Sequence, residues 1–157
     1  MPHFKPFVDG RIVIVRWLEP SPEGARALSH LIERTHAGCG EPIFFAGIIS
    51  AGCPTPSGDD RRALTLEHER IADRLLSART VVLGRSFRQS LMRSVMTNIL
   101  MIASRKGRGF VIDGSVGELA HAAKELAGVE PRWLVARLLD VGVLVPDEVE
   151  AALLPTT

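Results

Sequence analysis

The residues with the clearest chemical potential lie in a short turn after an apolar stretch, in the segment VVLGRSFRQSLMRSV (81–95). Gly84 permits a tight turn and Ser86 can act as a helix N-cap, so a strand is predicted to turn into a helix here. Arg85 and Arg88 then lie beside the free amides at the positive end of that helix, where the dipole favours anions. We therefore predict that Gly84, Arg85, Ser86 and Arg88 bind an anion or a carboxylate of a partner protein. The alternative is an ordinary cap with both arginines in water.

The sequence patterns of catalytic loops are incomplete in this chain, and no catalytic residue is predicted. The nucleophile elbow G-x-S-x-G fails because Arg88 stands where the second glycine belongs. Neither of the glycine-rich phosphate loops, G-x-x-x-x-G-K-[ST] and G-x-G-x-x-G, occurs. His68 is flanked by two glutamates, but the metalloprotease spacing H-E-x-x-H is absent because no second histidine stands four residues after His68. We expect a protein that is not an enzyme.

The cysteines and histidines do not form a metal-binding pattern. Cys39 follows His36 at metal-ligand spacing, but no second half of such a site exists, and Cys53 stands alone. We predict no metal and no cofactor. The N-terminal residues lack the apolar region of a signal peptide, and the most apolar stretches are too short to cross a bilayer. A cytoplasmic protein with reduced thiols and no membrane contact is therefore expected.

Charge is unevenly distributed along a chain that is nearly neutral overall. The 157 residues carry 19 Lys and Arg and 18 Asp and Glu, for a formal net charge of +1. Residues 74–112 contain eight bases and no acid, whereas residues 113–157 contain eight acids and three bases. Nucleic-acid binding is not expected, because Phe87 is the one aromatic residue of the basic stretch before position 110, and stacking surfaces need several.

Strands and helices are predicted to alternate along the chain. The Asp9-Gly10 dipeptide between two apolar runs indicates a β-hairpin, and the wholly apolar PIFFAGIIS indicates a strand covered on both faces. Further strands are expected at 80–84 and 109–113. Helices are expected from the Ser21 cap to Gly38, at about 60–77, at 86–104, from the Ser115–Glu118 capping box to Gly128, and from Pro131 onward.

This order predicts an α/β fold with a single mixed, mostly parallel sheet, helices packed on it and a C-terminal helical extension. We expect one domain over residues 1–129 and the extension over 130–157. The extension must bury its apolar residues, Trp133 and Leu138 among them, against its own domain or a second copy.

The helix at 86–104 carries two neighbouring apolar stripes. The first is predicted to face the sheet and consists of Phe87, Leu91, Val95, Ile99 and Ile102. The second consists of Met92, Met96 and Leu100. We expect these three residues to contact either a neighbouring helix or a partner, because methionine suits both cores and adaptable interfaces.

In layout the chain resembles the STAS domain of anti-sigma-factor antagonists and its SpoIIAA-like relatives, over roughly residues 3–127. The resemblance lies in VVLGRSFRQSLMRSV, with its strand, turn and long helix, and in GFVIDGSVGELAHAAKEL, with its strand and capped helix. It implies a small non-enzymatic regulatory module that binds a partner protein. The phosphorylated serine of the switch members is not carried over, because the loop SAGCPTPSGDD has no acid before Ser57.

We therefore expect a cytoplasmic, STAS-like interaction module that binds another protein, with self-association into a homodimer as a further expectation. The alternative is a small-ligand or enzymatic domain that uses the strand ends near Gly84, Asp113 and the loop at 50–60. A deep polar pocket at those strand ends would favour the alternative, whereas an exposed apolar patch would favour the module.

Overall fold

The fold begins with the hairpin that the Asp9-Gly10 dipeptide predicts. In the computed structural model, which describes residues 2–84, 86–103 and 110–156, β1 (Phe4–Asp9) runs antiparallel to β2 (Ile12–Trp17). Gly10 adopts a φ of 56°, which its missing side chain allows. The hairpin forms one edge of the sheet.

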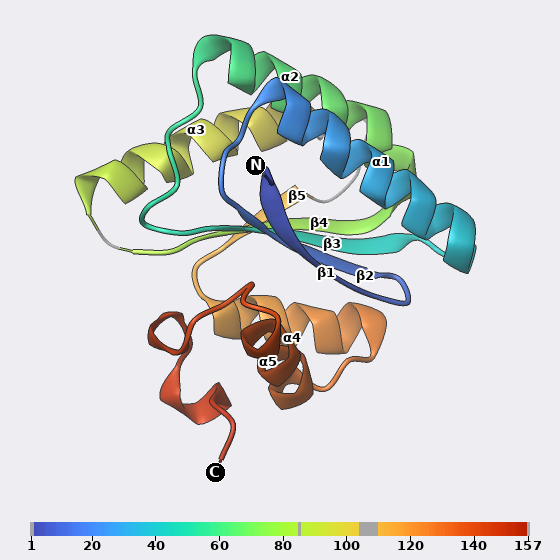
Figure 1. The fold of residues 1–157 in the computed structure, drawn as a ribbon, viewed down its shortest axis with the longest axis vertical. Coiled ribbons are helices and arrows are strands. Elements are labelled where there is room, and N and C mark those ends of the chain that lie inside the picture. The colour runs from blue at the N-terminus through green and yellow to red at the C-terminus, as the bar shows by residue number, and fades with distance from the viewer. Residues whose placement is uncertain (1, 85, 104–109, 157) are drawn as a thin grey trace.

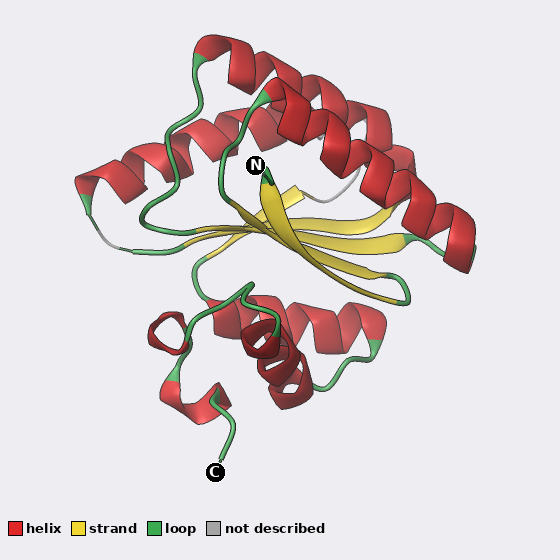
Figure 2. Ribbon diagram, in the orientation of Figure 1, coloured by secondary structure: helices red, strands yellow, loops and turns green. Residues whose placement is uncertain are grey.

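Three further strands extend the sheet, each parallel to the strand before it. They are β3 (Ile43–Ile49), β4 (Leu75–Val82) and β5 (Phe110–Asp113), and the spatial order is β1-β2-β3-β4-β5. The predicted α/β class with one mixed, mostly parallel sheet is confirmed (Figure 2). Because β2 to β5 are parallel, their carboxyl ends meet at the same edge of the sheet.

Helices cover both faces of this sheet, but unequally. One face carries α1 (Pro22–Cys39), α2 (Gly58–Ile71) and α3 (Phe87–Ala103), and the other carries α4 (Val116–Ala127) and α5 (Pro131–Asp140) (Figure 1). Parallel crossovers share one hand, so a sheet that adds strands in one direction receives its connecting helices on one face. After β5 the chain crosses to the opposite face. There it ends in two short 3-10 turns, η3 (Pro146–Glu148) and η4 (Ala151–Leu153).

Side-chain caps determine where most of the helices begin. Ser21 and Ser115 each accept a hydrogen bond from a backbone amide of the first turn, as predicted. The first helix ends later than predicted, at Cys39 rather than before Gly38, because Gly40 supplies the left-handed C-cap residue with a φ of 69°. Ser57 and Asp60 form a capping box that starts α2 at Gly58.

The predicted helix at 60–77 is wrong in its last turn. The helix α2 ends at Ile71, a single 3-10 turn η1 (Ala72–Arg74) follows, and β4 begins at Leu75. Pairing with β3 decides this boundary: Leu75 lies opposite Ile43, and the register shift there leaves Leu76 as the unpaired residue. Leu76 is accordingly 37% exposed and is not part of a helical stripe.

The central strand β3 divides the hydrophobic core into two. Alternate residues Ile43, Phe45 and Ile49 pack toward α1, α2 and α3, while Phe44, Ala46 and Ile48 pack toward α4 and α5. Every residue of β3 is buried, as its wholly apolar sequence predicts.

The C-terminal extension packs on its own sheet. Leu134, Val135 and Leu138 of α5 belong to the same buried cluster as Ile14 of β2 and Phe44 of β3. A pair of charged residues adds to this packing, because the Arg16 guanidinium donates to both carboxylate oxygens of Glu148, at 2.7 and 3.0 Å. This bidentate geometry, in which both side chains are about 15% exposed, ties the end of the chain to β2.

Candidate functional site

The turn predicted to bind an anion lies at the carboxyl edge of the sheet, between β4 and α3. Ser86 acts as the N-cap, since its hydroxyl accepts a hydrogen bond from the Gln89 amide at 3.3 Å. Arg88 is exposed but turns to the neighbouring loop, where it donates to the Cys53 carbonyl at 3.3 Å. Arg85 lies outside the described residues. The anion site thus stays a prediction, and its capping serine has the ordinary structural role.

Two residues that the sequence analysis did not single out hold this turn in place. Arg93 donates to the carbonyls of Val82 and Gly84, at 2.9 and 2.6 Å. Gln89 is 2% exposed and donates to the Ala51 carbonyl at 3.1 Å, while its own side-chain oxygen has no partner among the described residues. Gln89 is the third residue of α3 and Arg93 the seventh, and no motif in the sequence marks either of them as a residue that holds the turn.

Gly84 is required where it stands. Its φ is 97°, in the region that residues with side chains rarely adopt. A Cβ atom added there would lie 3.0 Å from the Cγ of Gln89. Glycine is therefore needed both for the backbone conformation and for the close contact with Gln89. Gln89 in turn connects this turn to the loop after β3.

A crevice of about 500 Å³ opens beside this turn, between the ends of β4 and β5. Gly84 and Arg93 line one side, Gly114 and Ser115 another, and residues 147–150 close the third. The acidic C-terminal segment therefore reaches the same edge of the sheet as the predicted anion site. Two of its carboxylates have partners, since Glu148 binds Arg16 and Glu150 accepts a hydrogen bond from the Gly117 amide at 3.2 Å, whereas Asp147 is exposed.

Asp113, at the end of β5, does not present its carboxylate to the crevice. Arg79 of β4 binds both carboxylate oxygens at 2.8 Å, and Asp113 is 2% exposed. Such a buried and fully paired carboxylate joins two strands. Of the three features named for a ligand site, the structure brings together Gly84 and the loop at 50–60, and engages Asp113 elsewhere.

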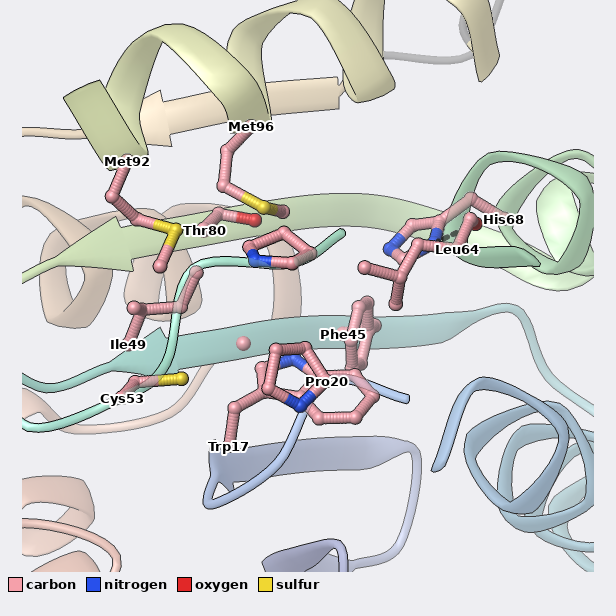
Figure 3. Close-up of a pocket in the computed structure, with 12 residues that line it drawn as sticks. Trp17, Pro20, Phe45, Ile49, Cys53, Leu64, His68, Thr80, Met92 and Met96 are labelled. Atoms are coloured by element: carbon pink, nitrogen blue, oxygen red, sulfur yellow. Dashed lines mark hydrogen bonds between the residues drawn. The ribbon is translucent and has the colours of Figure 1, made fainter. Parts of the chain in front are cut away.

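A small internal cavity lies between α3, α2 and the sheet (Figure 3). Figure 3 shows Met92 and Met96 pointing from α3 toward the sheet, above Trp17 and Phe45, with His68 entering from α2. The cavity volume is about 10 Å³, which holds at most one water molecule. Together with the burial of Leu100, at 4% exposed, this makes the Met92, Met96 and Leu100 stripe part of the core in this structure.

The two titratable residues of this cavity are both held uncharged. Burial raises the pKa of the Cys53 thiol to about 11, although Arg88 and Arg16 partly oppose the shift. The thiolate, which is the nucleophilic form, is therefore scarce at neutral pH. Burial also lowers the pKa of His68, against the opposing effects of the Leu64 carbonyl and Glu67. His68 contributes a neutral ring that lies between Phe45 and Phe110.

We expect the neutral His68 to make the fold sensitive to acid. Its pKa is lowered from 6.5, so the unfolded chain binds the proton more readily and the free energy of unfolding falls as the pH drops below about 7. One such group contributes a slope of at most about 1.4 kcal/mol per pH unit. Urea unfolding between pH 7.5 and 5 measures the slope, and His68→Gln should flatten it; equal slopes for both proteins would contradict the assignment to His68.

The outer face of α3 differs from the prediction. Of the stripe expected to face the sheet, Val95 and Ile99 are buried, but Phe87, Leu91 and Ile102 are 86%, 48% and 40% exposed. The helix is rotated so that the methionine stripe faces the sheet instead. The prediction that Phe87, Leu91 and Ile102 face the sheet is therefore wrong.

Of these three residues, Ile102 lines an open groove between α2 and α3, with a volume of about 350 Å³. Leu66 of α2, which is 63% exposed, also lines this groove. We call this surface the α2–α3 face and define it by Phe87, Leu91, Ile102, Leu66 and the residues that line the groove. The lining residues are Arg61, Arg62, Thr65, Leu66, Glu69, Val95, Asn98, Ile99 and Ile102.

The two residues of the extension that were predicted to lie in an interface differ in burial. Leu138 is 1% exposed and lies in the core between α5 and the sheet. Trp133 is 43% exposed, and its ring meets that of Phe7 edge-on, with centroids 6.5 Å apart. Only Trp133 of this pair retains surface that a partner could cover.

Residues 2–84, 86–103 and 110–156 contain neither a cluster of metal ligands nor a membrane-spanning helix. In these ranges no three His, Cys, Asp or Glu side chains gather as metal ligands would. Within the same ranges, no helix combines the length and apolar character needed to cross a bilayer.

Comparison with known proteins gives no relative from which a role could be transferred. No family model matches the chain. No curated protein sequence and no solved structure matches it either. The STAS-like resemblance therefore rests on the order of the elements and the hydrophobic pattern.

Proposed function

We propose that this chain is a non-enzymatic regulatory module that binds a partner protein through the α2–α3 face. The observation that carries the proposal is the exposure of large apolar side chains along one line. Phe87 and Leu91 lie one helical turn apart on α3 and are exposed. Ile102, further along the same helix, and Leu66 of α2 border the groove. Contiguous apolar surface of this kind is costly in water and is characteristic of interaction sites.

The shape and charge of the face favour an amphipathic helix with acidic side chains as the bound element. A groove between two helices accepts the apolar stripe of a third helix. The residues that line the groove include two arginines, Arg61 and Arg62, and one acid, Glu69; Arg62 also pairs with Asp59, and α3 contains no acidic residue. Basic rims attract acidic partners and speed their association.

The alternative, a small-ligand or enzymatic site at the strand ends, has weaker support. Of the three carboxylates that line that crevice, Glu148 is bound by Arg16 and Glu150 by the Gly117 amide, which leaves Asp147; the nearby Asp113 is bound by Arg79. We also propose a cytoplasmic location, because Cys39 and Cys53 are both free thiols.

Site-specific photocrosslinking in the cells that produce the protein tests the proposal. A photoreactive residue at Leu66 should form an adduct with another protein, through a segment with acidic residues around an apolar helical stripe. The same residue at Lys124, on the opposite face, is the control. Absence of a Leu66-specific adduct would overturn the proposal, and an adduct between two copies of this chain would replace it with homodimerisation.

Leu66→Asp should weaken binding of the crosslinked segment at least tenfold. A leucine buried in an interface contributes more than the 1.4 kcal/mol that a factor of ten represents, and the aspartate adds a desolvated charge. The folded state should be unaffected, since exposed substitutions change stability by about 0.5 kcal/mol or less. Fluorescence anisotropy with a synthetic peptide of that segment measures the affinity, and Val141→Asp, 44% exposed elsewhere, is the matched control. Equal affinities for both variants would remove Leu66 from the site.

A further inference from the structure

The two edges of the sheet differ in how they are protected against pairing with another strand. The strand β1 carries Lys5, Pro6 and Asp9, which are residues that discourage strand addition. The strand β5 reads Phe-Val-Ile-Asp, and its one charged residue, Asp113, is turned inward to Arg79. Within residues 2–84, 86–103 and 110–156, β4 is the only strand that pairs with β5. The outer edge of β5, although only four residues long, therefore carries no proline and no outward-pointing charge that would block an added strand.

A groove runs beside this edge, between β5 and α4, and its volume is about 520 Å³. The helix contributes residues at positions 118, 121, 122, 125 and 126, which lie on a single face of α4 because they are three and four apart. The apolar surface comes from Val111, 36% exposed, and Leu126, 42% exposed. A strand edge next to a helix-lined groove gives an added chain both backbone partners and pockets for alternate side chains.

The charges of the groove favour a basic occupant. Glu118 and Glu125 are exposed on the α4 side. The one guanidinium that lines the groove, Arg79, is already bound by Asp113, so the carboxylates of Glu118 and Glu125, the latter 2.9 Å from the His121 ring, leave the lining acidic. A second copy joined strand to strand about a twofold axis would bring two such acidic rims together, and like charges across a pair of strands are destabilising.

We infer that β5 and α4 form a docking groove for an extended basic peptide, which adds to the sheet as a sixth strand. The backbone of the peptide pairs with β5, its apolar side chains contact Val111 and Leu126, and its lysine or arginine side chains lie near Glu118 and Glu125. This groove is distinct from the α2–α3 face, which lies on the other side of the sheet (Figure 1).

The probe is a set of eight-residue peptides in which valine or threonine alternates with lysine, glutamine or glutamate. Fluorescence anisotropy against the full chain should give the tightest binding for the lysine set, at least tenfold tighter than for the glutamate set. Amide hydrogen exchange should show new protection in β5 when a lysine peptide is bound. Failure of every peptide to bind, equal affinity for all three sets, or protection that omits β5 would each overturn the inference.

A charge reversal provides the sharpest arm of this test. Glu125→Lys should weaken the binding of the lysine peptides at least tenfold and strengthen the binding of the glutamate peptides. Lys124→Glu is the matched control, because Lys124 lies on the same helix but does not line the groove. If Lys124→Glu, which changes the net charge in the opposite direction, strengthened binding of the lysine peptides as much as Glu125→Lys weakens it, the preference would be due to the net charge of the protein and the inference would fall. A dimer in sedimentation that forms through β5 and excludes the peptides would assign the edge to self-association instead.

Discussion

Replacing Met96 with glutamate is expected to unfold the protein at neutral pH. Met96 is 4% exposed and faces a cavity with room for no more than one water molecule. Neither of the two titratable residues that line this cavity, Cys53 and His68, supplies a positive charge at neutral pH. An unpaired buried carboxylate costs several kcal/mol, a large part of the roughly 5–15 kcal/mol by which a domain of this size is stable. Circular dichroism during thermal and urea unfolding measures the loss.

Two controls separate burial of the charge from other effects of the substitution. Leu91→Glu places the same side chain on the same helix, at a position 48% exposed, and should leave the melting temperature nearly unchanged. Met96→Leu preserves volume and should cost less than about 1.5 kcal/mol. If Met96→Glu remained folded and lost self-association or partner binding, Met96 would belong to an interface and not to the core.

Removal of residues 130–157 is expected to make the protein aggregate. This segment covers one face of the sheet with apolar side chains that are at most 8% exposed. Each of them contributes roughly 1.5–3 kcal/mol, so the sum, as an upper bound, is comparable to the whole stability of a domain. The residues concerned are Leu134, Val135, Leu138, Val143, Leu144 and Val149.

Sedimentation velocity and light scattering detect this outcome. The matched control ends the chain after Leu154, because Pro155 and Thr156 are exposed and their loss uncovers nothing. The control should sediment as the full chain does. A protein ending at residue 129 that stayed soluble with an unchanged sedimentation profile and melting temperature would show that the extension is dispensable for the core.

The features that the sequence predicts well are those determined by neighbouring residues. The hairpin at Asp9-Gly10 and the caps at Ser21 and Ser115 depend on turn geometry and on hydrogen bonds that span about three residues. The buried strand β3 depends on a continuous apolar run. From these elements and their order, the mixed sheet follows by the handedness of parallel crossovers.

The boundary between α2 and β4 could not be obtained in this way. Leu64, Ile71 and Leu75 repeat at helical spacing, so a local pattern extends the helix through Ser77. The pairing of Leu75 with Ile43, more than thirty residues away, overrides that pattern. Such tertiary contacts leave no periodic trace in the segment itself.

The rotation of α3 had a similar cause, and it changed the candidate site. Five apolar residues on one stripe and three on the adjoining stripe leave the orientation of the helix undetermined, since either stripe can face the sheet. The structure buries Met92 and Met96 and exposes Phe87 and Leu91. The surface now proposed for binding was therefore assigned to the core by its spacing. The turn at Gly84 and its Ser86 cap were predicted correctly, and the binding of an anion there stays a prediction.

The sequential order of the strands has a consequence for the chain as it is synthesised. Each strand pairs with the one made just before it, so β1 to β5 and the three helices on one face can assemble in the order of translation. The opposite face acquires its cover last, from α4, α5 and the segment that ends near Val149. At about 5–20 residues per second, the roughly 35 residues after β5 take about 2–7 seconds to make. During that interval Phe44, Ile48 and Val81 form an apolar surface with no cover, and the nascent protein is at its most dependent on the ribosome and on chaperones.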